Sequence, residues 1–208
     1  VSIPLDFSEF DEVIDVRTPL EFEEDHLPDA RNLPVLNDEQ RVEVGILYKN
    51  NPFEGRKLGA RYVSESIAGH LADALREKKT GWRPLLYCWR GGQRSTSFAT
   101  VLRSIGWRAR TLAGGYKAYR RYVMQDLVDQ LSKPGLQFRV ISGLTGVGKT
   151  RLLGALRTEG LQVMDLEAMA NHRGSLLGSV GKQPSQRHFE TLLHDTLRKL
   201  DPARPIYV

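Results

Sequence analysis

The chain has 208 residues, of which 40% are hydrophobic and 26% charged, and its formal net charge is +5. This composition is ordinary for a soluble globular protein of one or two domains. No apolar run approaches the ~18 residues of a membrane-spanning helix, so we expect no membrane partner. The single cysteine excludes an internal disulfide and is typical of a cytoplasmic protein.

Acidic and basic residues are separated along the chain. Residues 1–25 hold nine acids and a single base, Arg17, whereas the stretch from Lys78 to Gln125 contains no Asp or Glu. A charge run is often only a solvated face. Because this basic run surrounds the only cysteine, we also expect a polyanionic partner such as nucleic acid. The candidate nucleic-acid-binding residues are Arg83, Arg103, Arg108, Arg110, Lys117, Arg120 and Arg121.

Strands and helices alternate along the first part of the chain, a pattern that favours a parallel α/β sheet. The Lys133-Pro134-Gly135 break ends a long helix and is the predicted boundary between domains at 1–134 and 135–208. Within the first domain we predict strands at 13–16, 85–87 and 107–112, and helices at 19–25, 64–79, 95–106 and from 115 to the break. We expect Ser95 to cap the helix at 95–106. The apolar face of that helix comprises Phe98, Val101, Leu102 and Ile105.

The lone cysteine, Cys88, lies where a predicted strand turns into a predicted helix. Backbone N–H groups in such a turn form an anion-binding nest, and the helix dipole and nearby arginines favour thiolate over thiol. We therefore predict a reactive Cys88 assisted by Arg94, the alternative being a buried structural cysteine. The predicted anion-binding loop consists of Arg90, Gly91, Gly92, Gln93 and Ser95.

The second domain opens with a predicted strand at 137–142, and the segment 143–150 then matches the phosphate-binding pattern G-x-x-x-x-G-K-[ST]. A predicted helix follows, as that pattern requires. The glycines let backbone N–H groups wrap a diphosphate, the lysine adds a point charge, and the threonine hydroxyl can reach a Mg²⁺ ion. The predicted diphosphate site consists of Gly143, Gly146, Gly148, Lys149 and Thr150.

Beyond this loop we predict a strand at 161–165, a helix at 185–200 and a strand at 205–208. Asp165 ends its strand at the sheet edge where ligands bind in parallel α/β folds. For His172 three roles remain open: general base, phosphate partner or hydrogen-bonded loop residue. The last strand stops with the chain, which indicates a fragment. No cluster of metal ligands is predicted.

Two segments resemble the signatures of rhodanese sulfurtransferase domains. The residues at 15–22, 26–30 and 32–34 resemble the N-terminal signature, and those at 112–119 resemble the C-terminal one. Cys88 then falls at the position of the rhodanese nucleophile. Asp15 and Arg17 have a spacing that suits a buried pair or a helix cap, so we expect them to brace the fold.

The sequence departs from the usual rhodanese pattern in two ways. Asp25 and Asp29 stand where many rhodaneses have glycine, which we interpret as a minor change. The loop from Cys88 to Arg94 is Cys-x5-Arg, whereas common single-domain rhodaneses have Cys-x4-Arg. Because Cys-x5-Arg is also the spacing of cysteine phosphatases, a phosphatase is an alternative, although Tyr87 replaces the histidine that usually precedes a phosphatase cysteine.

The whole chain resembles the tRNA 2-selenouridine synthases, in which a rhodanese-like domain precedes a P-loop domain. The shared motifs include Tyr48-Lys49, 57–60, the loops at 88–92 and 143–150, and the segments 165–167, 172–175 and 183–186. The resemblance makes Asp165, His172, Arg173, Ser175, Gln183, Ser185 and Gln186 candidates for a second site. Family members are usually longer, so we expect a chain truncated at its C-terminus.

The resemblance implies that selenium from selenophosphate replaces sulfur in a wobble 2-thiouridine of tRNA. It also implies S-geranylation of that base from geranyl diphosphate, which would turn a poor leaving group into a better one. We expect the P-loop to hold the prenyl diphosphate, no tightly bound cofactor, and a selenophosphate-supplying enzyme as a further partner. Two alternatives remain: a sulfurtransferase fused to a P-loop NTPase, and a non-catalytic anion-binding module.

Overall fold

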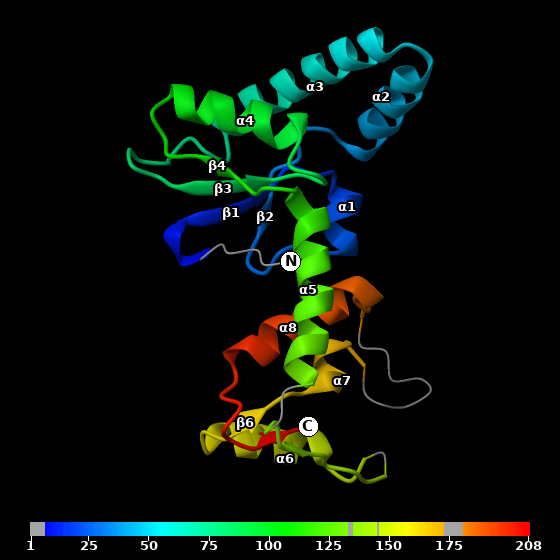
Figure 1. Cartoon of the computed structure of the whole chain (residues 1–208), viewed down its shortest axis with the longest axis vertical. Helices are drawn as coiled ribbons and strands as arrows, with labels where there is room; N and C mark the ends of the chain where they lie inside the picture. The colour runs from blue at the N-terminus through cyan, green and yellow to red at the C-terminus, as the bar shows by residue number, and fades with distance from the viewer. Residues whose placement is uncertain (1–6, 133–134, 145, 173–180) are drawn as a thin grey trace. The chain divides into compact units, whose positions relative to one another are not determined.

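The computed structural model describes residues 7–132, 135–144, 146–172 and 181–208. The chain divides into two compact units, residues 1–122 and 123–208, and each is built on its own parallel sheet (Figure 1). The predicted α/β architecture with parallel strands is therefore confirmed in both units.

The sheet of the first unit places the end of one strand beside the cysteine. Its strands β1 (Glu12–Asp15), β2 (Arg31–Asn32), β3 (Pro84–Tyr87) and β4 (Arg110–Thr111) are arranged in the order β2-β1-β3-β4. Asp15 pairs with Tyr87 in a parallel register, so β1 and β3 end at the same sheet edge. Every residue of β3 is buried, as expected for a central parallel strand.

Helices cover both faces of this sheet. Figure 1 shows α3 and α4 on one side of the sheet, and the start of α5 on the other. The core includes Ile14, Leu86, Phe98 and Leu102, all fully buried. The helical elements are η1 (Phe7–Glu9), α1 (Pro19–Glu24), α2 (Asp38–Asn50), α3 (Pro52–Ala72), α4 (Gln93–Ser104) and α5 (Gly115–Leu131), whose last residues belong to the second unit.

The hairpin of α2 and α3 differs from the prediction. Helix α2 was not predicted, and α3 both begins and ends earlier than the expected helix at 64–79. Helix α2 shows no clear apolar stripe in the sequence because it is largely exposed. Val42 is 60% accessible and Ile46 is 59% accessible. The two helices pack closely at Gly55, where a Cβ atom would lie 2.5 Å from the Cα of Tyr48.

Two expectations for α4 were wrong. Its N-cap is Gly92, so Ser95 lies within the first turn and does not cap the helix. The helix starts earlier because the carbonyl of Gly92 accepts a 3.1 Å hydrogen bond from the N–H of Thr96, which closes the first turn. Ile105 is half exposed and does not share the buried face of Phe98 and Leu102, because the helix ends at Ser104.

The second unit has the strand order β5-β7-β6, all parallel. His194 is buried on its last helix, and its Nε2 lies 2.8 Å from Oδ2 of Asp126 on α5. Burial lowers the pKa of His194, although the Asp126 carboxylate opposes this effect. Among the helices of the described residues, none has the length and apolarity needed to cross a membrane. The elements are β5 (Phe138–Arg139), α6 (Lys149–Thr158), β6 (Gln162–Val163), α7 (Leu166–Met169), α8 (Gln186–Lys199) and β7 (Ile206–Tyr207).

Asp15 and Arg17 form a buried ion pair at the end of β1, as one of the two arrangements predicted from their spacing. Nη2 of Arg17 lies 2.6 Å from Oδ2 of Asp15 and donates a second 2.6 Å hydrogen bond to the carbonyl of Asp25. The same guanidinium carbon lies 4.0 Å from the ring centroid of Tyr116 and 5.6 Å from that of Tyr87. The buried charge is thus balanced by one carboxylate, and a carbonyl and two aromatic rings surround it.

The two aspartates at glycine positions have structural consequences. Asp25 is buried, and its carboxylate accepts a 2.8 Å hydrogen bond from the hydroxyl of Tyr116. Asp29 adopts a φ of +57°, a conformation that glycine enters more easily. The departure at Asp25 is therefore not minor, because it adds a buried link between α1 and α5.

We expect Arg17→Ala to destabilise the first unit by about 3–5 kcal/mol, because it leaves the buried Asp15 carboxylate without a partner. Denaturant unfolding followed by circular dichroism would measure the loss. Arg83→Ala is the matched control, since Arg83 and Asp11 form an Arg–Asp pair that is exposed and should matter little. Equal destabilisation by the two substitutions would contradict the bracing role.

Candidate functional site

The backbone around Cys88 is held by the first turn of α5. The N–H of Tyr116 donates to the carbonyl of Cys88, and the N–H of Lys117 donates to that of Trp89, both at 2.9 Å. Gly115 has a φ of +58°, and a Cβ atom there would lie 2.2 Å from the Cys88 carbonyl oxygen. Only glycine permits this approach, so the turn that precedes α5 fixes the cysteine loop.

The sulfur of Cys88 receives two hydrogen bonds from its own loop. The N–H of Gly92 lies 3.2 Å from Sγ, and the hydroxyl of Ser95 lies 3.3 Å from it. Burial raises the pKa of Cys88, but hydrogen bonds from the Ser95 hydroxyl and from the backbone of Ser95 and Arg90, with the charge of Arg94, outweigh burial and leave the pKa below its usual value. A lowered pKa is typical of a reactive thiol rather than a structural one.

Arg94 is paired with a residue that the sequence did not indicate. Its Nη1 lies 2.7 Å from Oε2 of Glu21, and both side chains are largely buried. Burial raises the pKa of Glu21, but Arg94 and the backbone N–H of Thr18 lower it by more than burial raises it. The pKa is therefore below its usual value, and the carboxylate stays charged. Glu21 also forms a capping box with Thr18 at the start of α1. That Thr-x-x-Glu pattern, directly after β1, was the available signal for its position.

A cavity of about 600 Å³ opens over the cysteine. Most of the predicted anion-binding loop lines this cavity, together with Arg41, which was not predicted. Three arginines and the carboxylate of Glu21 therefore surround the space. A second cavity of about 350 Å³ shares Gln93 and Arg94 with the first and extends between α2, α3 and α4. The first cavity is lined by Glu21, Arg41, Cys88, Trp89, Arg90, Gly92, Gln93 and Arg94.

The predicted nucleic-acid-binding residues do not form one cluster. Arg83 directly precedes β3 and pairs with Asp11, and Arg110 begins β4 and pairs with Glu9. Both arginines lie at the sheet edge opposite Cys88. The acidic N-terminal segment thus neutralises part of the basic run. Arg103 lies near the end of α4 and Arg108 in the loop before β4, again away from the cysteine end. Lys117, Arg120 and Arg121 lie on the first turns of α5, next to the cysteine loop.

The P-loop has the expected strand-loop-helix arrangement between β5 and α6. Gly146 and Gly148 adopt φ values of +88° and +92°, a conformation that favours glycine. The Nζ of Lys149 donates to the carbonyls of Gly143 and Leu144 at 2.9 and 3.2 Å, so it folds back over the loop. Thr150 is exposed on the first turn of α6.

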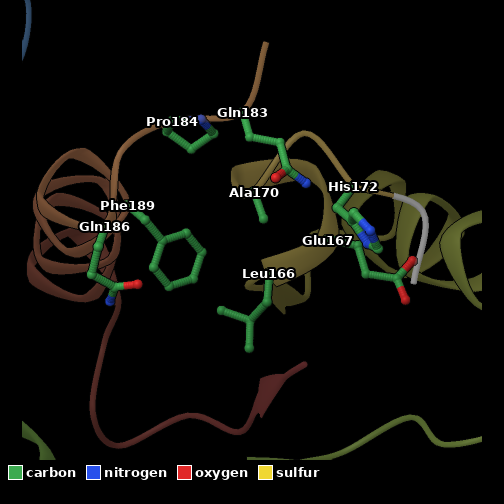
Figure 2. Close-up of a pocket in the computed structure, with 8 residues that line it drawn as sticks. All are labelled: Leu166, Glu167, Ala170, His172, Gln183, Pro184, Gln186 and Phe189. Carbon is green, nitrogen blue, oxygen red and sulfur yellow. The ribbon is translucent and has the colours of Figure 1, made fainter. Parts of the chain in front are cut away.

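A pocket of about 410 Å³ lies between α7 and α8 (Figure 2). Three of the predicted second-site residues, His172, Gln183 and Gln186, line it. Figure 2 shows an apolar centre, with Phe189 facing Leu166, between polar side chains on either side. The full lining is Leu166, Glu167, Ala170, His172, Gln183, Pro184, Gln186 and Phe189.

The remaining second-site candidates do not line this pocket. Asp165 caps α7 by accepting a 2.9 Å hydrogen bond from the N–H of Ala168, and Ser185 caps α8 through the N–H of His188 at 3.0 Å. The predicted residues Arg173 and Ser175 lie outside the described residues. The pocket also includes Phe189 and Glu167, which the sequence analysis did not assign. Glu167 lies within a motif noted there, whereas Phe189 is only an apolar position of a helix.

Comparison with known proteins agrees with the two-part organisation. Residues 5–122 match the rhodanese-like domain family, and residues 136–208 match the family described as the tRNA 2-selenouridine synthase AAA domain. The tRNA 2-selenouridine synthase of Hydrogenovibrio crunogenus is 40% identical over 194 residues, which cover 87% of this chain and 51% of that protein. The tRNA 2-selenouridine synthase of Nitrosomonas europaea is 42% identical over 192 residues, covering 91% and 49%.

The chain therefore spans about half the length of the curated relatives that it matches. Among solved structures, the N-terminal domain of a protein from Clostridium difficile 630 aligns with a TM-score of 0.48 and 38% identity. That alignment covers 54% of this chain and 88% of the other.

We expect Ser95→Ala to raise the pKa of the Cys88 thiol, because it removes a hydroxyl that donates to the sulfur and stabilises the thiolate. The pH dependence of alkylation by iodoacetamide would then shift to higher pH. Thr96→Ala is the matched control, since Thr96 is the exposed neighbour on the same helix. An unchanged profile in Ser95→Ala would show that the hydroxyl does not tune the thiol.

Proposed function

Because the chain belongs to the tRNA 2-selenouridine synthase family, we propose that it is a tRNA-modifying transferase that replaces sulfur with selenium in wobble 2-thiouridine. The observation that carries this proposal is that one chain combines two loops whose geometry suits an anion. One is the thiol-bearing loop at Cys88, and the other is the P-loop before α6. Each lies at the N-terminus of a helix, where backbone N–H groups favour anions.

Selenophosphate is the proposed ligand of the Cys88 cavity. Arg41, Arg90 and Arg94 line this cavity, and guanidinium groups bind phosphate oxygens with a matching fork of donors. Glu21 offsets only part of their charge. A small dianion is therefore favoured there, beside a thiol whose pKa is lowered. A selenophosphate-supplying enzyme is the corresponding partner.

Geranyl diphosphate is the proposed ligand of the P-loop, so this unit need not hydrolyse a nucleotide. Two glycines with positive φ and Lys149 suit any diphosphate, whatever group it carries. Thr150, which is exposed on the first turn of α6, is the proposed ligand of a Mg²⁺ ion bound to that diphosphate. The magnesium ion would neutralise charge on the diphosphate leaving group. The acceptor is the sulfur of the tRNA base.

Contact with tRNA is proposed for the basic residues beside the cysteine loop. Lys117 and Arg121 are exposed at the start of α5, on the same sheet edge as Cys88. Arg83 and Arg110 are weaker candidates, because they are already paired with acids. Binding through such cations should weaken steeply as salt rises, since it depends on releasing counterions from the phosphates.

We expect Cys88→Ala to stop selenation while geranylation of the base continues. Nucleoside mass spectrometry would detect this after incubating 2-thiouridine tRNA with the protein, geranyl diphosphate and selenophosphate. The variant should accumulate the geranylated base and form no 2-selenouridine. Selenation that persists without the thiol would remove Cys88 from the reaction. If the unsubstituted chain left the tRNA base unmodified, the proposed function would be rejected for these residues.

Lys149→Ala should show the opposite pattern, with geranylation lost, because the lysine charge no longer neutralises the prenyl diphosphate. Supplying tRNA that is already geranylated should restore selenation by this variant. Lys199→Ala is the control, since that lysine is exposed on α8. Rapid ATP hydrolysis by the chain, with no response to geranyl diphosphate, would contradict this assignment of the P-loop.

A further inference from the structure

The cysteine loop is better suited to the phosphorus end of selenophosphate than to its selenium end. Three arginines face the cavity above the sulfur, and their donors match a tetrahedral group bearing three oxygens. The loop N–H of Gly92 and the hydroxyl of Ser95 already engage the sulfur itself. A bound phosphoryl group would thus bring its phosphorus next to the thiolate. This step rests on the proposed selenophosphate substrate.

The spacing and the partners of Arg94 support the same orientation. Cys88 and Arg94 are separated by five residues, a loop wide enough to enclose a tetrahedral oxyanion. Glu21 holds the Arg94 guanidinium at 2.7 Å and so fixes the direction of its remaining donors. A guanidinium oriented by a second residue keeps its geometry during reaction, which favours stabilisation of charge that develops on phosphoryl oxygens.

The electron count separates two routes from selenophosphate. If the thiolate attacked selenium, the product would be a perselenide on sulfur, and phosphorus would have to leave as phosphite, reduced by two electrons. If the thiolate attacks phosphorus, the P–Se bond breaks with both electrons going to selenium. Phosphorus then stays at the oxidation level of phosphate, and no oxidant or reductant is needed.

We propose that the Cys88 thiolate attacks the phosphorus of selenophosphate, forming an S–P bond and expelling selenide. The selenide then attacks C2 of the alkylated base and expels the alkylthiolate, which takes up a proton to leave as a thiol. Water hydrolyses the phosphocysteine to inorganic phosphate and regenerates the thiol. Selenium therefore never becomes bonded to the protein. The first unit accepts the phosphoryl group and releases selenide, which is the nucleophile for the next step.

Ser95 is a positioning residue in this scheme, because it acts through the sulfur. Its hydroxyl lies 3.3 Å from Sγ and donates to the thiolate. The thiolate is the attacking group in the first step and the leaving group when the phosphocysteine is hydrolysed. Loss of this donor slows hydrolysis of the intermediate, so phosphocysteine should accumulate in Ser95→Ala.

The test uses selenophosphate labelled either in phosphorus or in selenium, mixed with the chain and rapidly quenched. Phosphorus label should appear on the protein and selenium label should not. Cys88→Ala should carry neither label. Ser95→Ala should retain severalfold more phosphorus label than the unsubstituted chain, Ser95→Thr should restore normal turnover, and the Thr96→Ala control should behave as the unsubstituted chain does.

Selenium label on Cys88 would overturn the proposal in favour of a perselenide. Release of selenide without either label on the protein, even in Ser95→Ala, would also overturn it, because hydrolysis would then be direct. These results are independent of the nucleoside assay. If the chain forms phosphocysteine but no 2-selenouridine, this step stands and the proposed function is wrong. If it forms 2-selenouridine but no phosphocysteine, the proposed function stands and this step is wrong.

Discussion

The buried guanidinium of Arg17 is the constraint on which the cysteine site depends. A charge taken out of water must find several partners, and here they are Asp15, the carbonyl of Asp25 and the faces of two tyrosines. Tyr87 directly precedes Cys88, and the N–H of Tyr116 holds the Cys88 carbonyl. One side chain therefore contacts the ends of β1 and α1, the residue before the reactive cysteine and the helix turn that holds the cysteine carbonyl.

The sequence predicted best those parts of the fold whose signals are local. The strand before Cys88 and the helix after it follow from an apolar run, two glycines and a helical pattern, and the P-loop follows in the same way. Helix α2 was missed because it buries little and so shows no clear apolar stripe. Its signal was a capping box, with Asn37 and Gln40 hydrogen bonded to each other's backbone. Such caps are informative where burial is not.

The side-chain partners within the site could not be predicted, because they depend on the tertiary structure. Arg94 and Glu21 are 73 positions apart, and nothing in their spacing indicates contact. The partners of the charged residues could not be predicted for the same reason. The acidic N-terminal segment and the basic run looked independent, yet Asp11 pairs with Arg83 and Glu9 with Arg110. Part of the apparent polyanion-binding charge is therefore used within the fold.

The two loops that we propose as anion sites share their backbone arrangement but differ in the side chain placed beside the anion. Each presents backbone N–H groups at the start of a helix, after glycines that let the chain turn. Among the residues that the structure describes in these two loops, only the first loop holds a thiol, with the sulfur of Cys88 hydrogen bonded to Gly92 and Ser95. The P-loop places Lys149 instead, which can neutralise a diphosphate but cannot attack it. A site without a nucleophile can help a diphosphate depart toward an external acceptor, whereas a site with one can take the phosphoryl group itself. That difference is the reason why we propose alkylation for the second unit and release of selenium for the first.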